Sequence, residues 1–214
     1  MDSAQVEALR ALLAPSGWLE RTRHFAGALH RRARTPHGLL VVGTPVHEPW
    51  HMTAHLADES RLAGLPELAP TLVRWNPPPG APRHLSIGID RIEQAGAKET
   101  LLVVGPDPAP ASLLERVADA RKAGTAIFAL DQGDQELESL AHESLAIRPA
   151  QDPVSFDGAQ HLISLAIGES GRWAGPGRCD LGPRAAEPVR TGTRGSLRGQ
   201  LARLLDAVSG AQQP

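Results

Sequence analysis

Short apolar runs, each separated from the next by a stretch with helical spacing, constrain the fold of this chain most strongly. Four runs are wholly apolar, 39–42, 101–104, 126–130 and 145–147, and the mixed segment 71–75 is a plausible fifth strand. An uninterrupted apolar run suits a strand that is buried on both faces, which is the usual situation in a parallel sheet. Strands that alternate with helices of about ten to fifteen residues indicate crossover connections. We therefore predict an α/β fold, a three-layer αβα sandwich with a five-stranded parallel sheet.

Helical spacing of apolar residues predicts a helix after each strand and further helices before the first strand. The predicted helices cover residues 2–34 with a break at 15–17, then 50–63, 85–95, 112–122, 135–143 and 155–169. Together the predicted elements give one α/β domain over residues 1–170. Glycine and proline are frequent in 171–195, which predicts a linker. Residues 196–214 regain an apolar stripe, which predicts a C-terminal docking helix and tail.

Composition excludes several classes of protein. The chain of 214 residues has no apolar run near the roughly 18 residues that a membrane span needs, and its start lacks the layout of a secretory signal. A single cysteine, Cys179, leaves no internal disulfide and no thiolate-rich zinc module. We therefore expect a cytoplasmic protein that has no membrane partner. The net charge of −2 and the aromatic content of 3% also argue against a nucleic-acid partner.

Ligands of an open parallel sheet bind beyond the carboxyl ends of the strands, in the loops that lead into helices. Two such loops, 43–48 and 105–110, are candidates here. Four residues at these loops are candidates for ligand binding: Gly43, Thr44, Asp107 and Ser112. The second loop has three prolines, which lack the N–H group that would bind a phosphate. A rigid structural connection is therefore the alternative interpretation of the second loop.

The first loop also contains the pattern H-E-x-x-H, from His47 to His51. In zinc proteases both histidines of this pattern lie one turn apart on a continuous helix, with the glutamate as base. Here Pro49 stands inside the pattern, where it would remove a hydrogen bond and clash within a continuing helix. We therefore expect the helix to begin at Pro49. His47 and Glu48 then lie in the loop, which argues against a protease.

His51 and His55 lie four residues apart on the helix predicted after Pro49, so both imidazoles project from one face. Two imidazoles at this spacing form a divalent-metal site when a third ligand comes from elsewhere. His161 on the last predicted helix is the best candidate, and Gln160 beside it is a further candidate for ligand binding. The chain has nine histidines, so two alternatives stay open. The pair acts in hydrogen bonding or proton transfer, or it has no functional role.

The order of these elements resembles the SIS (sugar isomerase) domain family, with its flavodoxin-like fold, and within it the sedoheptulose 7-phosphate (phosphoheptose) isomerases. The resemblance covers about residues 5–170 and is closest over 101–149. In that family a histidine and a glutamate four residues apart on the helix after the first strand bind zinc, and the last helix supplies a glutamine and a histidine. The resemblance implies zinc ligands at His51 and His55 and one on the last helix, where Gln160 and His161 are adjacent and only one of them can match. It also implies a homodimer or homotetramer.

Both candidate loops depart from the glycine- and serine-rich loops with which that family binds the sugar phosphate. Here Gly-Thr-Pro-Val-His stands at 43–47 and Gly-Pro-Asp-Pro-Ala-Pro at 105–110. The predicted function is therefore a SIS-like protein that binds a small ligand, a phosphosugar or another carbohydrate derivative, together with a divalent metal. A metal-dependent phosphosugar isomerase is the alternative, in which Glu48 or His47 would move a proton between adjacent carbons. A non-catalytic structural or regulatory dimer is the second alternative.

Overall fold

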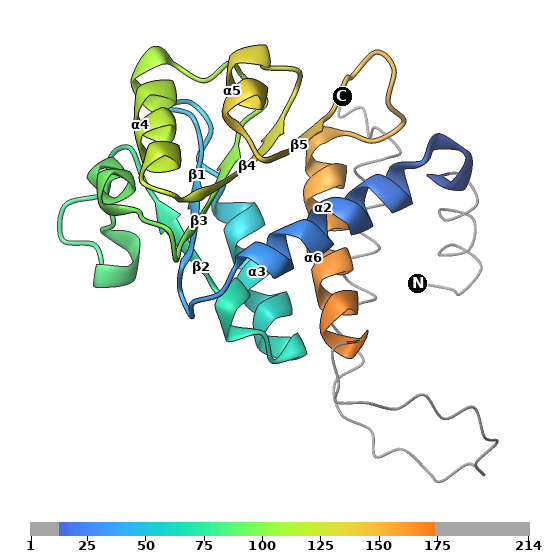
Figure 1. Cartoon of the computed structure of the whole chain (residues 1–214), viewed down its shortest axis with the longest axis horizontal. Coiled ribbons are helices and arrows are strands. Elements are labelled where there is room, and N and C mark those ends of the chain that lie inside the picture. The colour runs from blue at the N-terminus through green and yellow to red at the C-terminus, as the bar shows by residue number, and fades with distance from the viewer. Residues whose placement is uncertain (1–12, 174–214) are drawn as a thin grey trace, which may run out of the picture.

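The computed structural model describes residues 13–173, which form a five-stranded parallel sheet between two helical layers (Figure 1). The strands are β1 (Leu39–Val42), β2 (Pro70–Val73), β3 (Thr100–Val104), β4 (Ala126–Asp131) and β5 (Glu143–Ala146). Their order is β2-β1-β3-β4-β5, and every pairing is parallel. The predicted three-layer sandwich with a five-stranded parallel sheet is confirmed. Its strand order is that of flavodoxin-like folds.

Helices cover both faces of this sheet (Figure 1). On one face lie α2 (Trp18–Arg32), α3 (Trp50–Ala63) and α6 (Phe156–Trp173). On the other lie α4 (Ala111–Lys122), α5 (Gln135–Leu140) and the 3-10 helix η4 (Ile89–Gln94). Successive residues of a strand supply the two cores in turn. In β3, Leu102 and Val104 pack toward α2, α3 and α6, whereas Leu101 and Val103 pack toward α4.

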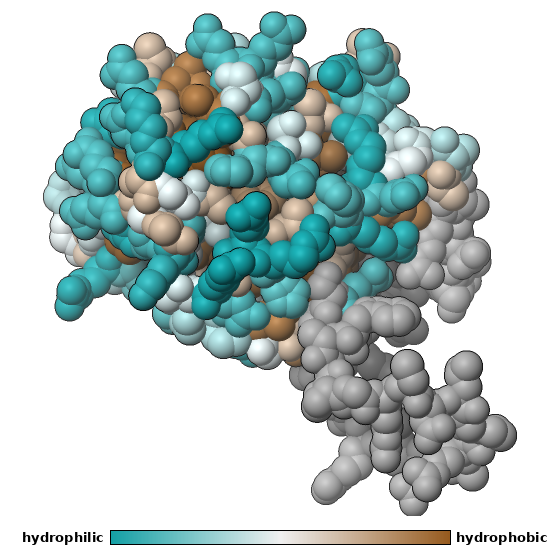
Figure 2. Space-filling model, viewed as in Figure 1, coloured by the Kyte–Doolittle hydropathy of each residue, from teal (hydrophilic) through white to brown (hydrophobic). Residues whose placement is uncertain are grey.

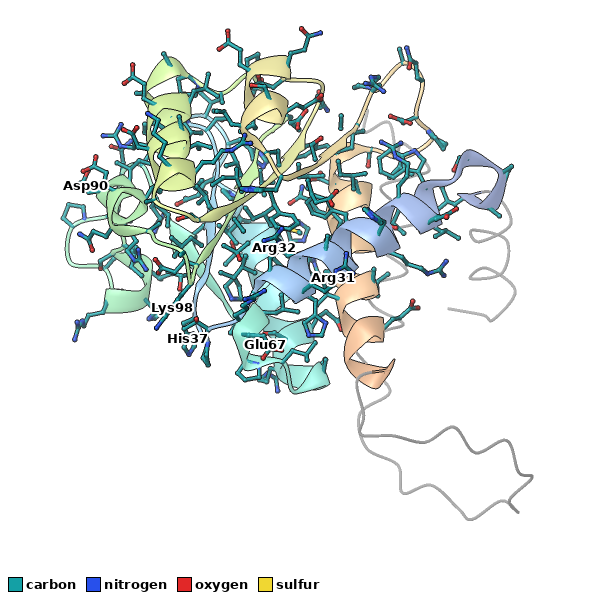
Figure 3. The ribbon with its side chains drawn as sticks, viewed as in Figure 1. Arg31, Arg32, His37, Glu67, Asp90 and Lys98 are labelled. Atoms are coloured by element: carbon teal, nitrogen blue, oxygen red, sulfur yellow. The ribbon has the colours of Figure 1, made fainter. Side chains whose placement is uncertain are left out.

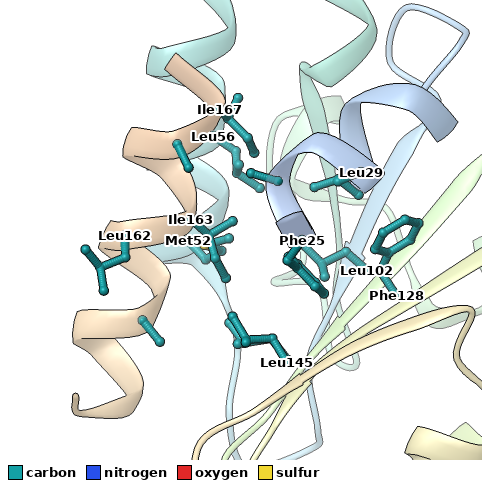
Figure 4. Close-up of a cluster of buried hydrophobic side chains, with 14 of the residues drawn as sticks. Phe25, Leu29, Met52, Leu56, Leu102, Phe128, Leu145, Leu162, Ile163 and Ile167 are labelled. Atoms are coloured by element: carbon teal, nitrogen blue, oxygen red, sulfur yellow. The ribbon is translucent and has the colours of Figure 1, made fainter. Parts of the chain in front are cut away.

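The larger core holds α3 against α6 (Figure 4). Met52 and Leu56 of α3 lie beside Ile163 and Ile167 of α6, and all four side chains are buried. Each such side chain contributes roughly 1.5–3 kcal/mol when it leaves water. Since α3 follows β1 and α6 follows β5, both helices begin at the carboxyl edge of the sheet. The apolar packing therefore places the first turns of two distant segments side by side.

The segment 85–95, predicted as an α-helix, instead forms two short 3-10 helices, η3 (Arg83–Leu85) and η4. Between them the chain pairs with the residue after β2, since the Arg74 N–H donates to the carbonyl of Ile87 and a parallel bridge joins Arg74 to Gly88. This pairing removes the residues before η4 from the helical conformation. The prediction was wrong because a tertiary pairing overrode the local apolar spacing.

The helix predicted over 135–143 ends earlier, at Leu140, because the chain joins the sheet sooner than expected. The N–H of His142 donates to the carbonyl of Ile127, and His142 Nδ1 accepts the N–H of Ile127. Glu143 then opens β5 opposite Phe128. Strand β5 therefore begins before the apolar run at 145–147 that indicated it.

Some predictions lie partly or wholly outside the described residues. The leading helix is described from Trp18, directly after Gly17, whose positive φ of 70° breaks the helical path. Residues 2–12 of that prediction lie outside the described range, as do 174–214, which include the predicted docking helix and all but the first residues of the predicted linker. Within the described range, no helix is long and apolar enough to cross a membrane.

The molecular face in Figure 2 is mostly hydrophilic, with small apolar spots. Arg31 and Arg32 at the end of α2, and His37 and Lys98, which precede β1 and β3, are exposed on the amino-terminal side of the sheet (Figure 3). These basic side chains therefore lie at the edge opposite the loops that were expected to bind a ligand. They do not contribute charge to the carboxyl edge.

Candidate metal centre

The loop between β1 and α3 determines which of the histidines from His47 to His55 lie on the helix. Helix α3 begins at Trp50, one residue later than expected, and Pro49 caps it with φ −83° and ψ 42°. His47 lies in the loop, where its N–H donates to the carbonyl of Thr44 at 3.2 Å. His47 and His51 are therefore not one helical turn apart. The H-E-x-x-H pattern does not form the histidine pair of a zinc protease.

Three histidine rings meet between α3 and α6. The Nε2 atoms of His51 and His55 are 2.9 Å apart. The ring centroid of His161 lies 5.1 Å from that of His51 and 4.5 Å from that of His55. His55 and His161 are 7% and 3% exposed, whereas His51 is half-buried. One nitrogen from each ring lies within 4.8 Å of the others, so the three form a candidate metal-binding group, the His triad.

Local and tertiary structure each supply part of the His triad. His51 and His55 share a face because they are four residues apart on α3. His161 comes from the second turn of α6 and reaches them because the apolar packing described above holds the two helices together. The His triad thus lies close to the carboxyl edge of the sheet, where both helices begin.

The geometry of the His triad fits a divalent ion. Imidazole nitrogens that bind one zinc ion at 2.0–2.1 Å in a tetrahedral site lie about 3.4 Å apart. The Nε2 atoms of His51 and His55 are 2.9 Å apart, and one nitrogen of each ring lies within 4.8 Å of the others, a range that includes this separation. Neutral imidazole suits zinc and other borderline metals. Three protein ligands would also leave one coordination position for water or a ligand.

Gly43 and Thr44 lie where the two candidate loops touch. A Cβ atom at Gly43 would lie 1.9 Å from the carbonyl oxygen of His47, and Trp75 Nε1 donates to the Gly43 carbonyl at 2.8 Å. A Cβ atom at Gly105 would lie 2.8 Å from Thr44 Cγ2, so the second loop passes directly against this threonine. Among the described residues, the buried Thr44 hydroxyl has no hydrogen-bond partner. Thr44 therefore offers a hydroxyl group at the junction of the loops.

The other predicted ligand-binding residues are placed differently. Asp107 and Ser112 are exposed, on the loop after β3 and in the first turn of α4. Gln160 is 2% exposed, and its amide donates to Asp157 Oδ1 at 3.0 Å within α6. Thr44 thus lies at the contact between the two loops, whereas Asp107 and Ser112 face solvent. The side-chain amide of Gln160 is hydrogen-bonded within its own helix. Their role in ligand binding stays a prediction.

Glu48, predicted as a proton carrier, forms an ion pair with Arg74. The guanidinium of Arg74 donates through Nε to Glu48 Oε1 and through Nη2 to Oε2, the second at 2.9 Å. This bidentate pair raises the pKa of Arg74. It joins the loop after β1 to the end of β2. His47 is the other predicted proton carrier. Its ring packs edge-to-face against the ring of Phe156, with the two centroids 5.6 Å apart.

Asp131 is a buried carboxylate that the sequence analysis missed. It ends β4 and is 1% exposed. Its Oδ1 accepts the N–H groups of Gly133 at 2.6 Å and Asp134 at 3.0 Å, whereas Oδ2 is buried without a hydrogen-bond partner among the described residues. Burial is the main cause that raises the pKa of Asp131 to about 6, and the negative charges of Glu138 and Asp134 add to it. An acid that directly follows an apolar run was the signal in the sequence.

Glu59 is a second buried carboxylate that the sequence analysis did not single out. It is 5% exposed and lies on α3, two helical turns after His51 and one after His55. The spacing of four and eight residues from the two histidines was the available signal.

Fold and site together define this chain as a three-layer α/β protein with a candidate metal centre near the carboxyl edge of its sheet. No family model and no curated protein matches its sequence. Among solved structures, it is similar to a proposed phosphosugar isomerase from Salmonella typhimurium LT2, at 14% identity and a TM-score of 0.47. It is also similar to one from Silicibacter pomeroyi DSS-3, at 13% identity and the same TM-score.

Both similarities cover 76% of this chain but only 45% and 49% of the solved chains, so this chain spans less than half of their length. At this level the likeness concerns the arrangement of helices and strands alone. It does not extend to a ligand or an activity.

Proposed function

We propose that this chain binds a divalent metal, zinc in the first place, through His51, His55 and His161. The His triad is the observation that carries the proposal, because three imidazole nitrogens from two helices meet within 4.8 Å at a largely buried point. Imidazole is the most common protein ligand for such metals. A bound zinc ion would act as a Lewis acid toward a ligand oxygen at its open position.

We further propose that a small anionic ligand, a phosphosugar or another carbohydrate derivative, binds beside the metal. Helices α3 and α6 both begin at this edge of the sheet, and the N-terminal end of a helix attracts anions. The buried hydroxyl of Thr44 would donate to such a ligand. The choice of a sugar derivative rests on the SIS-like order of elements, and a homodimer or homotetramer is proposed on the same resemblance.

A metal-dependent isomerase is the second candidate function. It needs a group that moves a proton between adjacent carbon atoms. His47 favours this candidate, because its Nε2 is buried without a hydrogen-bond partner among the described residues, in the loop directly before α3. Glu48 in contrast is bound by Arg74. We therefore place proton transfer at His47 rather than at Glu48 in this candidate.

The metal proposal predicts one divalent ion per chain. Protein purified without chelator should carry that ion, or take it up on titration with Zn²⁺. His55→Ala and His161→Ala should each weaken Zn²⁺ binding at least about 100-fold, since two ligands would remain of three. Elemental analysis and competition with a chromophoric chelator measure both quantities.

His84→Ala is the matched control for the metal experiment, because His84 is an exposed histidine on η3 and its loss should leave the affinity unchanged. Circular dichroism verifies that each variant is folded. A wild-type protein that takes up no stoichiometric Zn²⁺, or folded triad variants that bind it as tightly as the wild type, would contradict the proposal.

The ligand proposal predicts that a panel of sugar phosphates contains at least one that stabilises the Zn²⁺-loaded protein. A ligand at 100 times its Kd adds about 2.7 kcal/mol to the free energy of unfolding. Thr44→Val should reduce this stabilisation, whereas Thr71→Val, which removes an exposed hydroxyl bonded to the carbonyl of His37, should not. Thermal denaturation with and without Zn²⁺ measures the effect. If no sugar phosphate stabilises the loaded protein, the phosphosugar part of the proposal is wrong while the metal part stands.

A further inference from the structure

An arginine lies against the first candidate loop at the carboxyl edge of the sheet. Arg74 directly follows β2, and β2 is the neighbour of β1, which ends at the loop 43–48. The backbone of Arg74 is fixed by its N–H bond to the carbonyl of Ile87 at 2.9 Å and by the bridge to Gly88. Its side chain is 19% exposed. The guanidinium is therefore held in place and still reaches solvent.

The guanidinium of Arg74 presents two parallel donors that Glu48 occupies. Nε and Nη2 donate to the two carboxylate oxygens of Glu48, the second at 2.9 Å. Nη1 donates to the carbonyl of Leu85 at 3.4 Å. The same planar pair of donors also matches two oxygens of a phosphate group. The carboxylate of Glu48 therefore stands where two phosphate oxygens would bind.

The carboxylate of Glu48 is free to leave the guanidinium at low cost. Its side chain is 36% exposed, and ion pairs that reach solvent contribute little to stability because water replaces the partner. A phosphate monoester has a charge of about −1.5 to −2 at pH 7 and three acceptor oxygens. It thus brings more negative charge to Arg74 than a carboxylate does.

The start of α3 adds to the attraction for an anion at this place. Glu48 directly precedes Pro49, the N-cap of α3, so the Arg74 guanidinium lies within one glutamate side chain of the helix start. No side chain caps this helix by a hydrogen bond, and its first turn has no acidic residue. The positive end of the helix dipole therefore acts on a bound phosphate in the same sense as Arg74.

We propose that Arg74 binds the phosphate group of the ligand, and that Glu48 occupies the guanidinium in the free protein until the phosphate displaces it. The proposal rests on the anionic ligand of the proposed function but not on the metal. It also adds specificity, because an uncharged sugar brings no charge with which to replace the carboxylate of Glu48.

Inorganic phosphate is the probe, and isothermal titration calorimetry at constant ionic strength measures its binding. Glu48→Gln removes the competing charge and should bind phosphate at least about threefold more tightly than the wild type. Arg74→Gln should weaken phosphate binding at least about 10-fold, since charge-assisted hydrogen bonds are lost. The double variant should bind as weakly as Arg74→Gln, because the gain from Glu48→Gln requires the guanidinium.

Glu99→Gln is the matched control. Arg91 and Glu99 form a similar ion pair, with side chains 28% and 18% exposed, at the opposite edge of the sheet, where Glu99 precedes β3. This variant frees an arginine in the same way and should leave the phosphate affinity unchanged. Circular dichroism verifies that each variant is folded. Acetate in place of phosphate serves as a carboxylate probe, and it should bind at least about 10-fold more weakly.

Phosphate that binds to neither the wild type nor Glu48→Gln, or that binds Glu48→Gln no more tightly than the wild type, would overturn the proposal. An equal gain in Glu99→Gln would do so too, since any freed arginine would then bind the ion. Acetate that binds as tightly as phosphate would assign the guanidinium to a carboxylate ligand instead. If phosphate binds as expected but no sugar phosphate stabilises the protein, the sugar part of the proposed function fails and the role of Arg74 stands.

Discussion

Replacing Gly43 by alanine should destabilise the folded protein by about 3 to 5 kcal/mol, or prevent folding. A Cβ atom at this position would lie 1.9 Å from the carbonyl oxygen of His47 and 2.6 Å from Pro49 Cδ. Both atoms belong to the backbone or to a proline ring, so neither can move aside as the end of a flexible side chain would. The loop is also held by the hydrogen bond from Trp75 Nε1 to the Gly43 carbonyl, 2.8 Å long. Relief of the clash would therefore break this contact or shift the start of α3.

Urea unfolding of Gly43→Ala and Gly96→Ala measures the effect. Gly96 is the control because no atom lies within 4 Å of the Cβ position there, and its N–H bond to Glu99 Oε2 would remain. Its replacement should change the free energy of unfolding by less than about 1 kcal/mol. Because His51 follows the Gly43 loop closely, a folded Gly43→Ala protein should also bind Zn²⁺ more weakly. Equal stability of the two variants would show that the loop is not packed as described.

Asp131→Asn should stabilise the protein at pH 8 by about 2 to 3 kcal/mol and have little effect near pH 4. Burial raises the pKa of Asp131 to about 6, so the folded protein binds this proton more tightly than the unfolded chain does. The stabilisation by Asp131 is therefore complete below pH 4. It falls as the pH rises through 6 and changes no further above that. An amide needs no ionisation and can still accept the N–H groups of Gly133 and Asp134.

The free energy of unfolding measured from pH 4 to pH 8 tests this expectation. The advantage of Asp131→Asn over the wild type should grow with pH, mainly between pH 4 and pH 6. Asp107→Asn removes an exposed carboxylate from a neighbouring loop and controls for the loss of one negative charge. A constant difference between wild type and Asp131→Asn across this range would mean that the pKa of Asp131 is not raised.

The sheet could be predicted from the sequence because its strands are buried on both faces. A strand in that environment is mostly apolar, as in β1 and residues 101–104 of β3, and so it stands out as an uninterrupted run. The bounds of α3 were also predictable, since Pro49 precedes it and Gly64, with φ 69°, ends it. Where a segment has a weaker local preference for helix or strand, contacts with neighbouring elements determine its conformation. The pairing of Arg74 with Ile87 turned a predicted helix into two 3-10 helices, and the pairing of His142 with Ile127 shortened α5.

The candidate metal site was predictable to the extent that helical spacing governs it. A spacing of four positions from His51 to His55 suffices to place two rings on one face, and their Nε2 atoms are 2.9 Å apart in the structure. His161 could be named only as a candidate, because its approach depends on how α6 packs against α3. Nothing in the spacing of charged residues could reveal that Glu48 is bound by Arg74. Ion pairs between separate elements depend on tertiary packing and have no local pattern.

The amino-acid sequence by itself determined the five parallel strands, the start of α3 after Pro49 and the paired imidazoles on it, because continuous apolar runs, proline and helical periodicity act within a few neighbouring residues. The tertiary structure alone decided that His161 completes the His triad and that Asp131 and Glu59 are buried. Burial and contact between distant segments arise only when helices and sheet pack together. Two carboxylates that look like ordinary surface acids in the sequence are thereby buried.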